Sequence, residues 1–485
     1  MTVARPATTA SPRNSPLGNP VQPQARERTP WLFAFLCLLI LILPSYLVLA
    51  GPLKSNGSPA KMIAFVLFGF AVLGFVLTRR TARTRTLRPG IVLILVYSLA
   101  MLLVYGVGLS RLGSAIAEPN KNRAILIVLA NVGVALCALT RVETVRQRTV
   151  LLGCLAIGLT FNCAVGLLQT SAHIDLHLLF QPPGFVDNQR DQGRGLAATL
   201  TDRFGTKRAF GTSAHSIEFA VLAAVTVPLT VHFARYAANR QVRLLAALAA
   251  GVALLATSAG VSRSGLIALA AALLVYVWTF TLRGLGVAVV AGAGAVLGNV
   301  ATAPGTVQAL WKTITNSAED VSVTDRIAAY AKVSQTLRDH PVLGLGLGAD
   351  PAREYGWLDN EWMQALVQGG SVGFLAMIML AGGGILGVAA ALRGATTPRE
   401  RDQAYAMGAV FIGILASSYT FDLFSYQQAS LLFFILFGLL WSNFTISFPE
   451  AGITRAVQIV RAPTALSNAA NRAIQFAHTI GRSEI

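Results

Sequence analysis

The chain has 485 residues, of which 54% are hydrophobic and 12% are charged, and its mean hydropathy is +0.60. Soluble domains carry about 25% charged residues, so this composition excludes an ordinary soluble protein and predicts a polytopic membrane protein. The net charge of +18 raises the question of a nucleic-acid partner, which would need a basic face on a folded module.

Membrane spans are predicted from apolar runs of about 20 residues, the length that crosses a bilayer as a helix. Twelve such runs occur, at 31–50, 62–78, 91–109, 124–140, 149–168, 217–234, 244–261, 265–282, 285–303, 371–392, 404–421 and 427–447. The expected fold is therefore an all-α integral membrane protein with about twelve transmembrane helices. The run 31–50 is interpreted as a retained first helix because no cleavage site follows it.

Arginines set the expected orientation, since basic residues stay on the cytoplasmic side. With the N-terminus inside, the inner segments carry 23 arginines and 6 acidic residues, which accounts for +17 of the net charge of +18. The basic charge is therefore a topology signal, and no nucleic-acid partner is expected. Both termini are predicted to be cytoplasmic.

The chain divides into a tail, a membrane domain and a second tail. Residues 1–30 are rich in Pro, Ser, Thr and Asn and should be disordered, and 31–448 form the polytopic domain. Residues 449–485 are basic and form either an interfacial helix or a flexible tail. Outer loops at about 169–216 and 304–370 are too long for simple connectors, and such loops carry function.

Arginines accompany these outer segments. Arg208, His215 and Glu218 end the first long loop, and Arg263 stands at the outer boundary between the seventh and eighth spans. A guanidinium group at a membrane boundary is costly unless it is paired, and its planar donors suit phosphate oxygens. An anionic site for a lipid diphosphate is one interpretation. The other is that each arginine snorkels or pairs with a carboxylate such as Asp325 or Glu218.

The second long loop is expected to contain helices. Thr324 is a reasonable N-cap for an amphipathic helix over 325–339, which includes Arg326 and is stopped by His340 and Pro341. The run GLGLG at 344–348 is then expected to be a flexible loop.

A second short helix is predicted to start near Asp359 and to end at Gly369 and Gly370. Asp359 is either the cap of this helix or a residue with a chemical role. Five residues are thus expected on the outer face: Arg208, Arg263, Arg326, His340 and Asp359.

Other chemistries have weaker support. His173 and His177 have the spacing of a zinc pair on a helix, but a lone pair of this kind is common. The serines of SRSG do not form a nucleophile elbow. A lipid-linked-sugar flippase or transporter would place ionisable groups deep in the spans, and the predicted spans contain few. All four cysteines fall inside spans, so no disulfide is expected.

Four stretches together resemble a known family. RAFGTSAHSIEFA, SRSGLIALAAAL, DRIAAYAKVSQTLRDHPVLGLGLG and DNEWMQALVQGGSVGFL occur in the order and hydrophobic setting of the O-antigen ligase and O-antigen polymerase superfamily. The resemblance extends over most of the chain from the fifth span onward, and the large outer loop before the tenth span is similar to the family architecture.

The resemblance implies an activity and roles for residues. Proteins of this family transfer a glycan from a polyprenyl-diphosphate carrier to an acceptor glycan or glycolipid at the outer face of the bacterial inner membrane, so the resemblance implies that location for this chain. The transfer is inverting and uses no metal or other cofactor. It implies that Arg208 and Arg263 hold the diphosphate and that Arg326 is a third candidate, with His215 and Glu218 beside them. The alternative within the family is a polymerase that extends a lipid-linked glycan.

The family's acceptor-side motif is altered here. Typical members have His, then Asn, Ser or Gln, and later two spaced glycines. In this chain Asp359 and Asn360 take the first two positions, with Gly370 and Gly373 following. A carboxylate accepts a proton from an acceptor hydroxyl as imidazole does, if it lies within hydrogen-bond reach. Asp359 is therefore the predicted catalytic residue, with Asn360, His340 and Trp357 as substrate-binding candidates.

Overall fold

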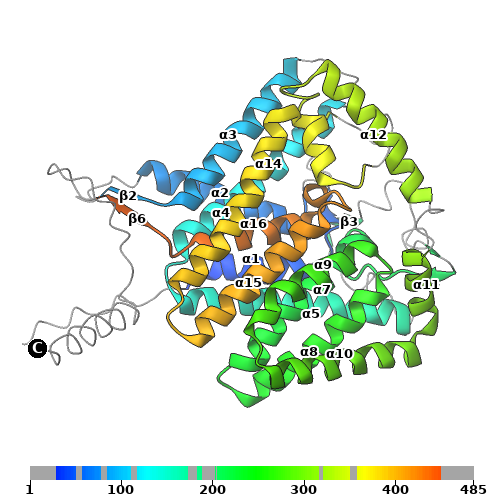
Figure 1. Cartoon of the computed structure of the whole chain (residues 1–485). Coiled ribbons are helices and arrows are strands. Elements are labelled where there is room, and N and C mark those ends of the chain that lie inside the picture. The colour runs from blue at the N-terminus through cyan, green and yellow to red at the C-terminus, as the bar shows by residue number, and fades with distance from the viewer. Residues whose placement is uncertain are drawn as a thin grey trace, which may run out of the picture.

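The computed structural model describes residues 29–50, 57–77, 85–110, 117–172, 183–187, 202–203, 205–315, 321–349 and 358–448. Helices dominate these residues (Figure 1). They are α1 (Trp31–Ile42), α2 (Pro59–Leu77), α3 (Pro89–Ser110), α4 (Ala117–Arg141), α5 (Val145–Ser171), α7 (Ser216–Tyr236), α8 (Arg240–Ala259), α9 (Arg263–Tyr276), α10 (Leu282–Thr302), α11 (Pro304–Thr315), α12 (Val321–Asp339), α14 (Glu361–Gly394), α15 (Pro398–Ser417) and α16 (Gln427–Trp441), with short 3-10 helices η3 (Val277–Thr279) and η5 (Leu423–Ser425).

Three two-stranded antiparallel ribbons complete the described structure. They pair β1 (Leu47–Leu49) with β3 (Phe185–Asp187), β2 (Arg85–Leu87) with β6 (Ile446–Phe448), and β4 (Asp202–Arg203) with β5 (Thr206–Lys207). Figure 1 shows β2 and β6 at one side of the molecule and α11 and α12 at the other. The ribbons close the ends of the helical bundle, and the helices make its body.

Each predicted span coincides with a helix, which confirms an all-α membrane protein. By length and composition, seven helices among the described residues can cross a membrane. Apolar helices of 10–17 residues, shorter than these seven, lie at α1, α2, α9 and α16. The helix α15 has 20 residues but opens on the charged sequence PRERD. The predicted spans 31–50 and 427–447 were too long, because each ends in a strand, β1 and β6. The count of twelve spans stays a prediction.

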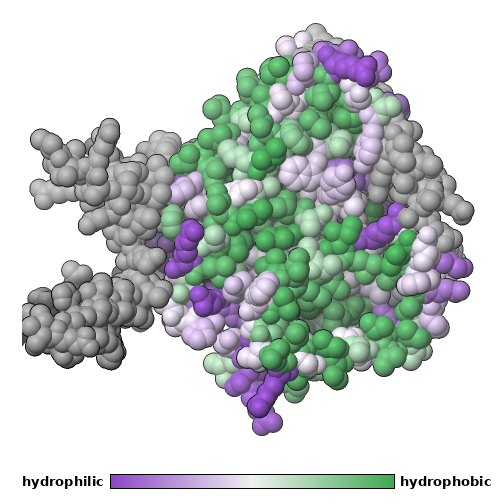
Figure 2. All heavy atoms as spheres, viewed as in Figure 1, coloured by the Kyte–Doolittle hydropathy of each residue, from purple (hydrophilic) through white to green (hydrophobic). Residues whose placement is uncertain are grey.

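The surface has the character of a membrane protein. Large apolar side chains are exposed along α3 and α10, including Leu99 at 69% and Val290 at 73%. Figure 2 shows apolar side chains over most of the viewed face and hydrophilic ones mainly at its margins. An apolar surface of this extent marks contact with a membrane in place of water, whereas α16 and most of α7 lie in the interior.

The helix α14 contains a sharp reversal at Gly370. This residue has φ 57° and ψ −146°, and a Cβ there would lie within 2.7 Å of the backbone of Val342 and Gly344. The rings of Trp362 and Phe374 are 6.0 Å apart, although twelve residues of straight helix would separate them by about 18 Å. Residues 361–369 therefore fold back beside the span that begins at 371, as the predicted short helix ending at Gly369 and Gly370 requires.

The loop after α12 is packed against this reversal. Leu345 donates its backbone N–H to the Val367 carbonyl at 2.9 Å, and Gly346 donates to Gln368 at 2.8 Å. A Cβ on Gly346 would lie 2.3 Å from the Cα of Gly108 in α3. The expectation of a flexible loop at 344–348 was therefore wrong, because glycines here permit close backbone contact. Thr324 also lies inside α12, which begins at Val321, and is not its cap.

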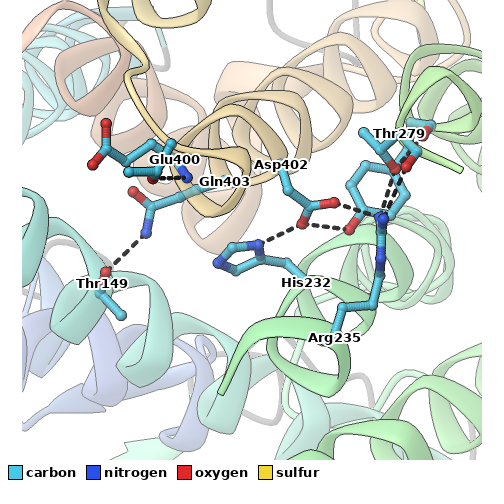
Figure 3. Close-up of polar contacts among 9 residues, drawn as sticks. Thr149, His232, Arg235, Thr279, Glu400, Asp402 and Gln403 are labelled. Atoms are coloured by element: carbon cyan, nitrogen blue, oxygen red, sulfur yellow. Dashed lines mark hydrogen bonds and ion pairs between the residues drawn. The ribbon is translucent and has the colours of Figure 1, made fainter. Parts of the chain in front are cut away.

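One buried carboxylate joins three helices near the start of α15 (Figure 3). Asp402 of α15 lies 2.6 Å from His232 Nδ1 and accepts a hydrogen bond of 2.9 Å from the Tyr276 hydroxyl. Arg235 pairs with the other oxygen of Asp402 and also donates to the side chain and carbonyl of Thr279 at 2.8 Å. The contacts fasten α7, α9 and α15 together, and the opposite ends of these helices bear the candidate site.

Candidate glycan-transfer site

Arg208 lies where the described part of the first long loop meets α8. Its side chain is 7% exposed, and its Nε donates to the carbonyl of Gly260 at 3.0 Å. The next residue, Ala209, donates its backbone N–H to Ala259 at 2.9 Å. These two bonds hold the guanidinium against the carboxyl end of α8, where helical carbonyls lack partners within the helix.

Arg263 is held in the same way by another helix. It is the first residue of α9, and its Nε donates to the Thr313 carbonyl in the last turn of α11 at 2.8 Å. The turn before it contains Val261 at φ 42°, a strained value for a β-branched residue. Both arginines predicted to hold a diphosphate are therefore fixed through Nε at a helix carboxyl end.

His215 caps α7 and stands among charged groups. Its Nδ1 accepts the backbone N–H of Ile217 at 3.2 Å. Burial, and after it the charge of Arg208, lower the pKa of His215 from 6.5 to about 4, while Asp359 opposes the change. The imidazole is thus neutral near pH 7, and both Arg208 and Asp359 are close enough to act on it.

Glu218 is fully buried inside this group. One carboxylate oxygen accepts the backbone N–H of Ala214 at 3.0 Å, and the other accepts those of Gln428 and Ala429 at 2.9 and 3.1 Å. These bonds fasten the start of α7 to the start of α16. Glu218 therefore has a structural part in the arrangement, and its substrate-binding role stays a prediction.

The cap of α14 is Asn360 and not Asp359. The Asn360 side chain accepts the backbone N–H groups of Trp362 and Met363 at 3.0 and 3.3 Å, and its own N–H donates to Asp422 at 2.7 Å. Asp359, one residue earlier, has φ 44°, a left-handed conformation that side chains rarely adopt. Strain of this kind gathers at functional sites, so the helix-cap interpretation of Asp359 was wrong while the chemical one remains a prediction.

Residues that sequence reasoning did not single out hold the start of α14, next to Asp359, in place. Glu361 donates its backbone N–H to the Ser418 carbonyl at 3.0 Å, and its side-chain carboxylate accepts the backbone N–H of Phe424 at 2.8 Å. Thr420 donates to the Ser264 hydroxyl at 2.8 Å, which joins this segment to the start of α9. No motif marks these residues, because their pairing depends on helix ends that are far apart in the sequence.

Tyr426 is a further member of the group. Its ring lies 6.1 Å from that of His215, and burial together with the charges of Asp422, Asp359 and Glu218 raises its pKa well above the usual range. Its hydroxyl therefore stays protonated and able to donate a hydrogen bond. The only sequence signal was a tyrosine at the start of the last predicted span.

His340 is not brought into the group, while the side chain of Arg326 and the whole of Trp357 are not among the parts that the structure describes. His340 lies beside the reversal at Gly370, and the helix 361–369, about 13 Å long, separates it from Asp359. Arg326 lies in α12, of which Tyr330 contacts Asn360 at 3.4 Å. Trp357, residues 1–28 of the predicted tail 1–30, and the predicted tail 449–485 lie outside the described residues.

The alternative metal site has no counterpart in the part of the chain that the structure describes. No group of three or more His, Cys, Asp or Glu side chains suited to a metal ion occurs there. His173 and His177 lie outside that part.

The fold and the grouped arginines define a class: an all-helical, multi-pass membrane protein with a basic and acidic site where helix ends meet. The comparison with protein families makes this more specific. Residues 245–378, from α8 into α14, match the family model described as O-antigen ligase, which confirms the predicted resemblance to the O-antigen ligase and polymerase superfamily. The matched segment contains Arg263, Asn360 and Asp359. No curated protein matches the chain.

The family match also bears on the general role. It supports a ligase-type or polymerase-type function in polysaccharide biogenesis, with a lipid-linked glycan and a glycan acceptor as substrates. Arg208, His215 and Glu218 precede the matched segment, and the structure brings them to it.

Proposed function

We propose that this protein transfers a glycan from a polyprenyl-diphosphate carrier to a hydroxyl of an acceptor glycan or glycolipid at the extracytoplasmic face of the membrane. The main support is the group formed by Arg208, His215 and Asp359, in which a fixed guanidinium and a strained carboxylate both stand within electrostatic reach of the same imidazole. Such a group matches a reaction that needs an anion-binding side and a proton-accepting side.

The proposed reaction is a direct displacement. The acceptor oxygen attacks the anomeric carbon as the bond from that carbon to the diphosphate breaks, and the bonding electron pair leaves with the diphosphate. The hydroxyl proton passes to the carboxylate of Asp359, and the anomeric configuration inverts. A positioned base contributes roughly 10²–10⁴-fold to rates of this kind.

Arg208 and Arg263 stabilise the leaving diphosphate in this proposal. Their positions fit the role because both guanidinium groups are fixed before substrate binds, which is the arrangement that stabilises developing negative charge most effectively. His215 is neutral near pH 7 and adds no positive charge. Because its Nδ1 accepts the Ile217 N–H, the neutral ring carries its proton on Nε2 and can donate a hydrogen bond there.

Kinetics of purified variants test the anion-binding side. Arg263→Ala is expected to raise the KM for a polyprenyl-diphosphate glycan and to lower kcat, by roughly a hundredfold in kcat/KM, since a charge-assisted bidentate contact is lost. The matched control is Arg283→Ala, which changes an exposed arginine in the first turn of α10. Equal kcat/KM in the wild-type protein and Arg263→Ala would refute the assignment.

The same preparation separates a ligase from a polymerase, the nearest alternative. The protein is supplied with the polyprenyl-diphosphate glycan alone and the product lengths are measured. Chain extension without a second acceptor supports the polymerase, whereas transfer only after a separate acceptor is added supports the ligase.

A further inference from the structure

Tyr426 is fixed at the start of the last helix, beside the first turn of α7. It directly precedes α16, and its backbone N–H donates to the Leu423 carbonyl at 3.3 Å, while its carbonyl accepts the N–H of Ser430 at 3.0 Å. Its ring lies 6.1 Å from that of His215 and 5.8 Å from that of Phe421. Contacts of the backbone and of the ring therefore both hold this side chain in the candidate site.

Tyr426 senses both sides of that site. The charges of Asp359 and Arg208 both act on its hydroxyl. The same two charges act on the imidazole of His215, whose ring is the neighbour of Tyr426. The two rings thus lie where the proton-accepting side and the anion-binding side of the site approach each other.

The hydroxyl of Tyr426 is a donor that the protein itself does not use. Within the described part of the chain it makes no hydrogen bond, and the side chain is only partly buried. Because burial and the neighbouring carboxylates raise its pKa, the hydroxyl stays protonated. A tyrosine hydroxyl in a protein interior usually finds a partner, so this one is available to a substrate that enters the site.

We propose that the Tyr426 hydroxyl donates a hydrogen bond to the oxygen that joins the anomeric carbon to the diphosphate, as a further catalytic residue; this rests on the proposed function. That oxygen gains negative charge as its bond to the carbon breaks, and a donor already in place stabilises such charge. A donor bonded to the attacking oxygen would instead hold back the electron pair that forms the new bond. The proton stays on Tyr426, because the diphosphate leaves as an anion with the bonding pair and the acceptor proton passes to Asp359.

The first test compares two tyrosine variants of the full-length protein. Tyr426→Phe keeps the ring beside His215 and is expected to lower kcat about tenfold, the loss that one hydrogen bond represents. The KM for the polyprenyl-diphosphate glycan should stay within about twofold, because the bond strengthens only as charge develops. Tyr419→Phe is the matched control and should keep the wild-type kcat, since it removes a hydroxyl from a side chain that is 61% exposed in the turn after α15.

A second donor separates catalysis from a structural role. In this donor, sulfur replaces the oxygen between the anomeric carbon and the diphosphate, and thioether sulfur is a weak hydrogen-bond acceptor. Single-turnover rates give the ratio of the oxygen donor to the sulfur donor, which should be about tenfold smaller in Tyr426→Phe than in the wild-type protein, since the variant has no bond to lose. A structural role would lower both rates equally.

Two results would overturn the assignment of Tyr426: a wild-type kcat in Tyr426→Phe, or the same ratio of the two donors in the variant and in the wild-type protein. Absence of any transfer by the wild-type protein from the oxygen donor would instead refute the proposed function, and the role of Tyr426 with it.

Discussion

Replacement of Asp359 by glycine is expected to raise stability and to abolish activity together. A left-handed φ in a residue other than glycine costs about 1 kcal/mol at the tolerant end of the range for such strain, and Asp359 has φ 44°. Glycine adopts this conformation freely, so Asp359→Gly should stabilise the protein by roughly that amount. The helix start is preserved, because Asn360 supplies the cap.

The activity should change in the opposite direction. Loss of the carboxylate removes the proposed proton acceptor and should lower kcat by about a hundredfold or more, with donor KM little changed. Asp359→Asn keeps the size and tolerance of positive φ and should show the same loss. Asn360→Ala provides the contrast, since removal of a cap costs about 1 kcal/mol of stability.

Thermal unfolding of the purified protein in detergent and initial rates of glycan transfer measure these effects. Transfer within twofold of the wild-type rate by both Asp359→Gly and Asp359→Asn would refute the catalytic assignment. A fall in unfolding temperature for Asp359→Gly would refute the argument from strain.

Three further predictions concern other parts of the structure. Asp402→Ala should destabilise the protein by about 3–5 kcal/mol, because it leaves buried donors and a cation without their acceptor; thermal unfolding checks this, and an unchanged midpoint would contradict it. Gly370→Ala should prevent folding at the reversal, whereas Gly382→Ala, with no atom within 4 Å of the added Cβ, should be stable; yields of folded protein compare the two. The folded-state pKa of His215 is lowered from its usual 6.5 to about 4, so stability should fall as pH decreases through that window. His215→Gln should weaken this dependence in pH-resolved unfolding curves, and an identical dependence in the variant would count against it.

The sequence predicted helices better than it predicted their ends. Apolar runs of the required length located a helix at every predicted span, because burial in a bilayer imposes a uniform apolar composition. An apolar composition does not show where a helix ends and a strand begins. The run 427–447 therefore gave no sign that α16 ends at Trp441 and that a strand follows it. Likewise, the glycines of GLGLG predict a flexible loop. In the folded chain the same glycines, which lack side chains, allow the backbone of another segment to pack closely against them.

The candidate site was predictable in its charges and not in its contacts. Arginine at a membrane boundary is conspicuous in the sequence, and Arg208 and Arg263 were found in this way. Asp359 and Asn360 are equally good caps by residue type, and only the backbone angles assign the cap to Asn360.

The bonds that fix Arg208 and Arg263 have a consequence for turnover. The carboxyl end of a helix carries about half a negative charge, so each guanidinium is partly balanced before any substrate arrives. Under the proposed function, the product diphosphate would be bound by two guanidinium groups whose positive charge is already partly balanced by helix carbonyl groups. Release of the diphosphate would then require neither a rearrangement of the arginines nor a compensating ion. A site that stabilises the leaving diphosphate would in this way avoid retaining the product.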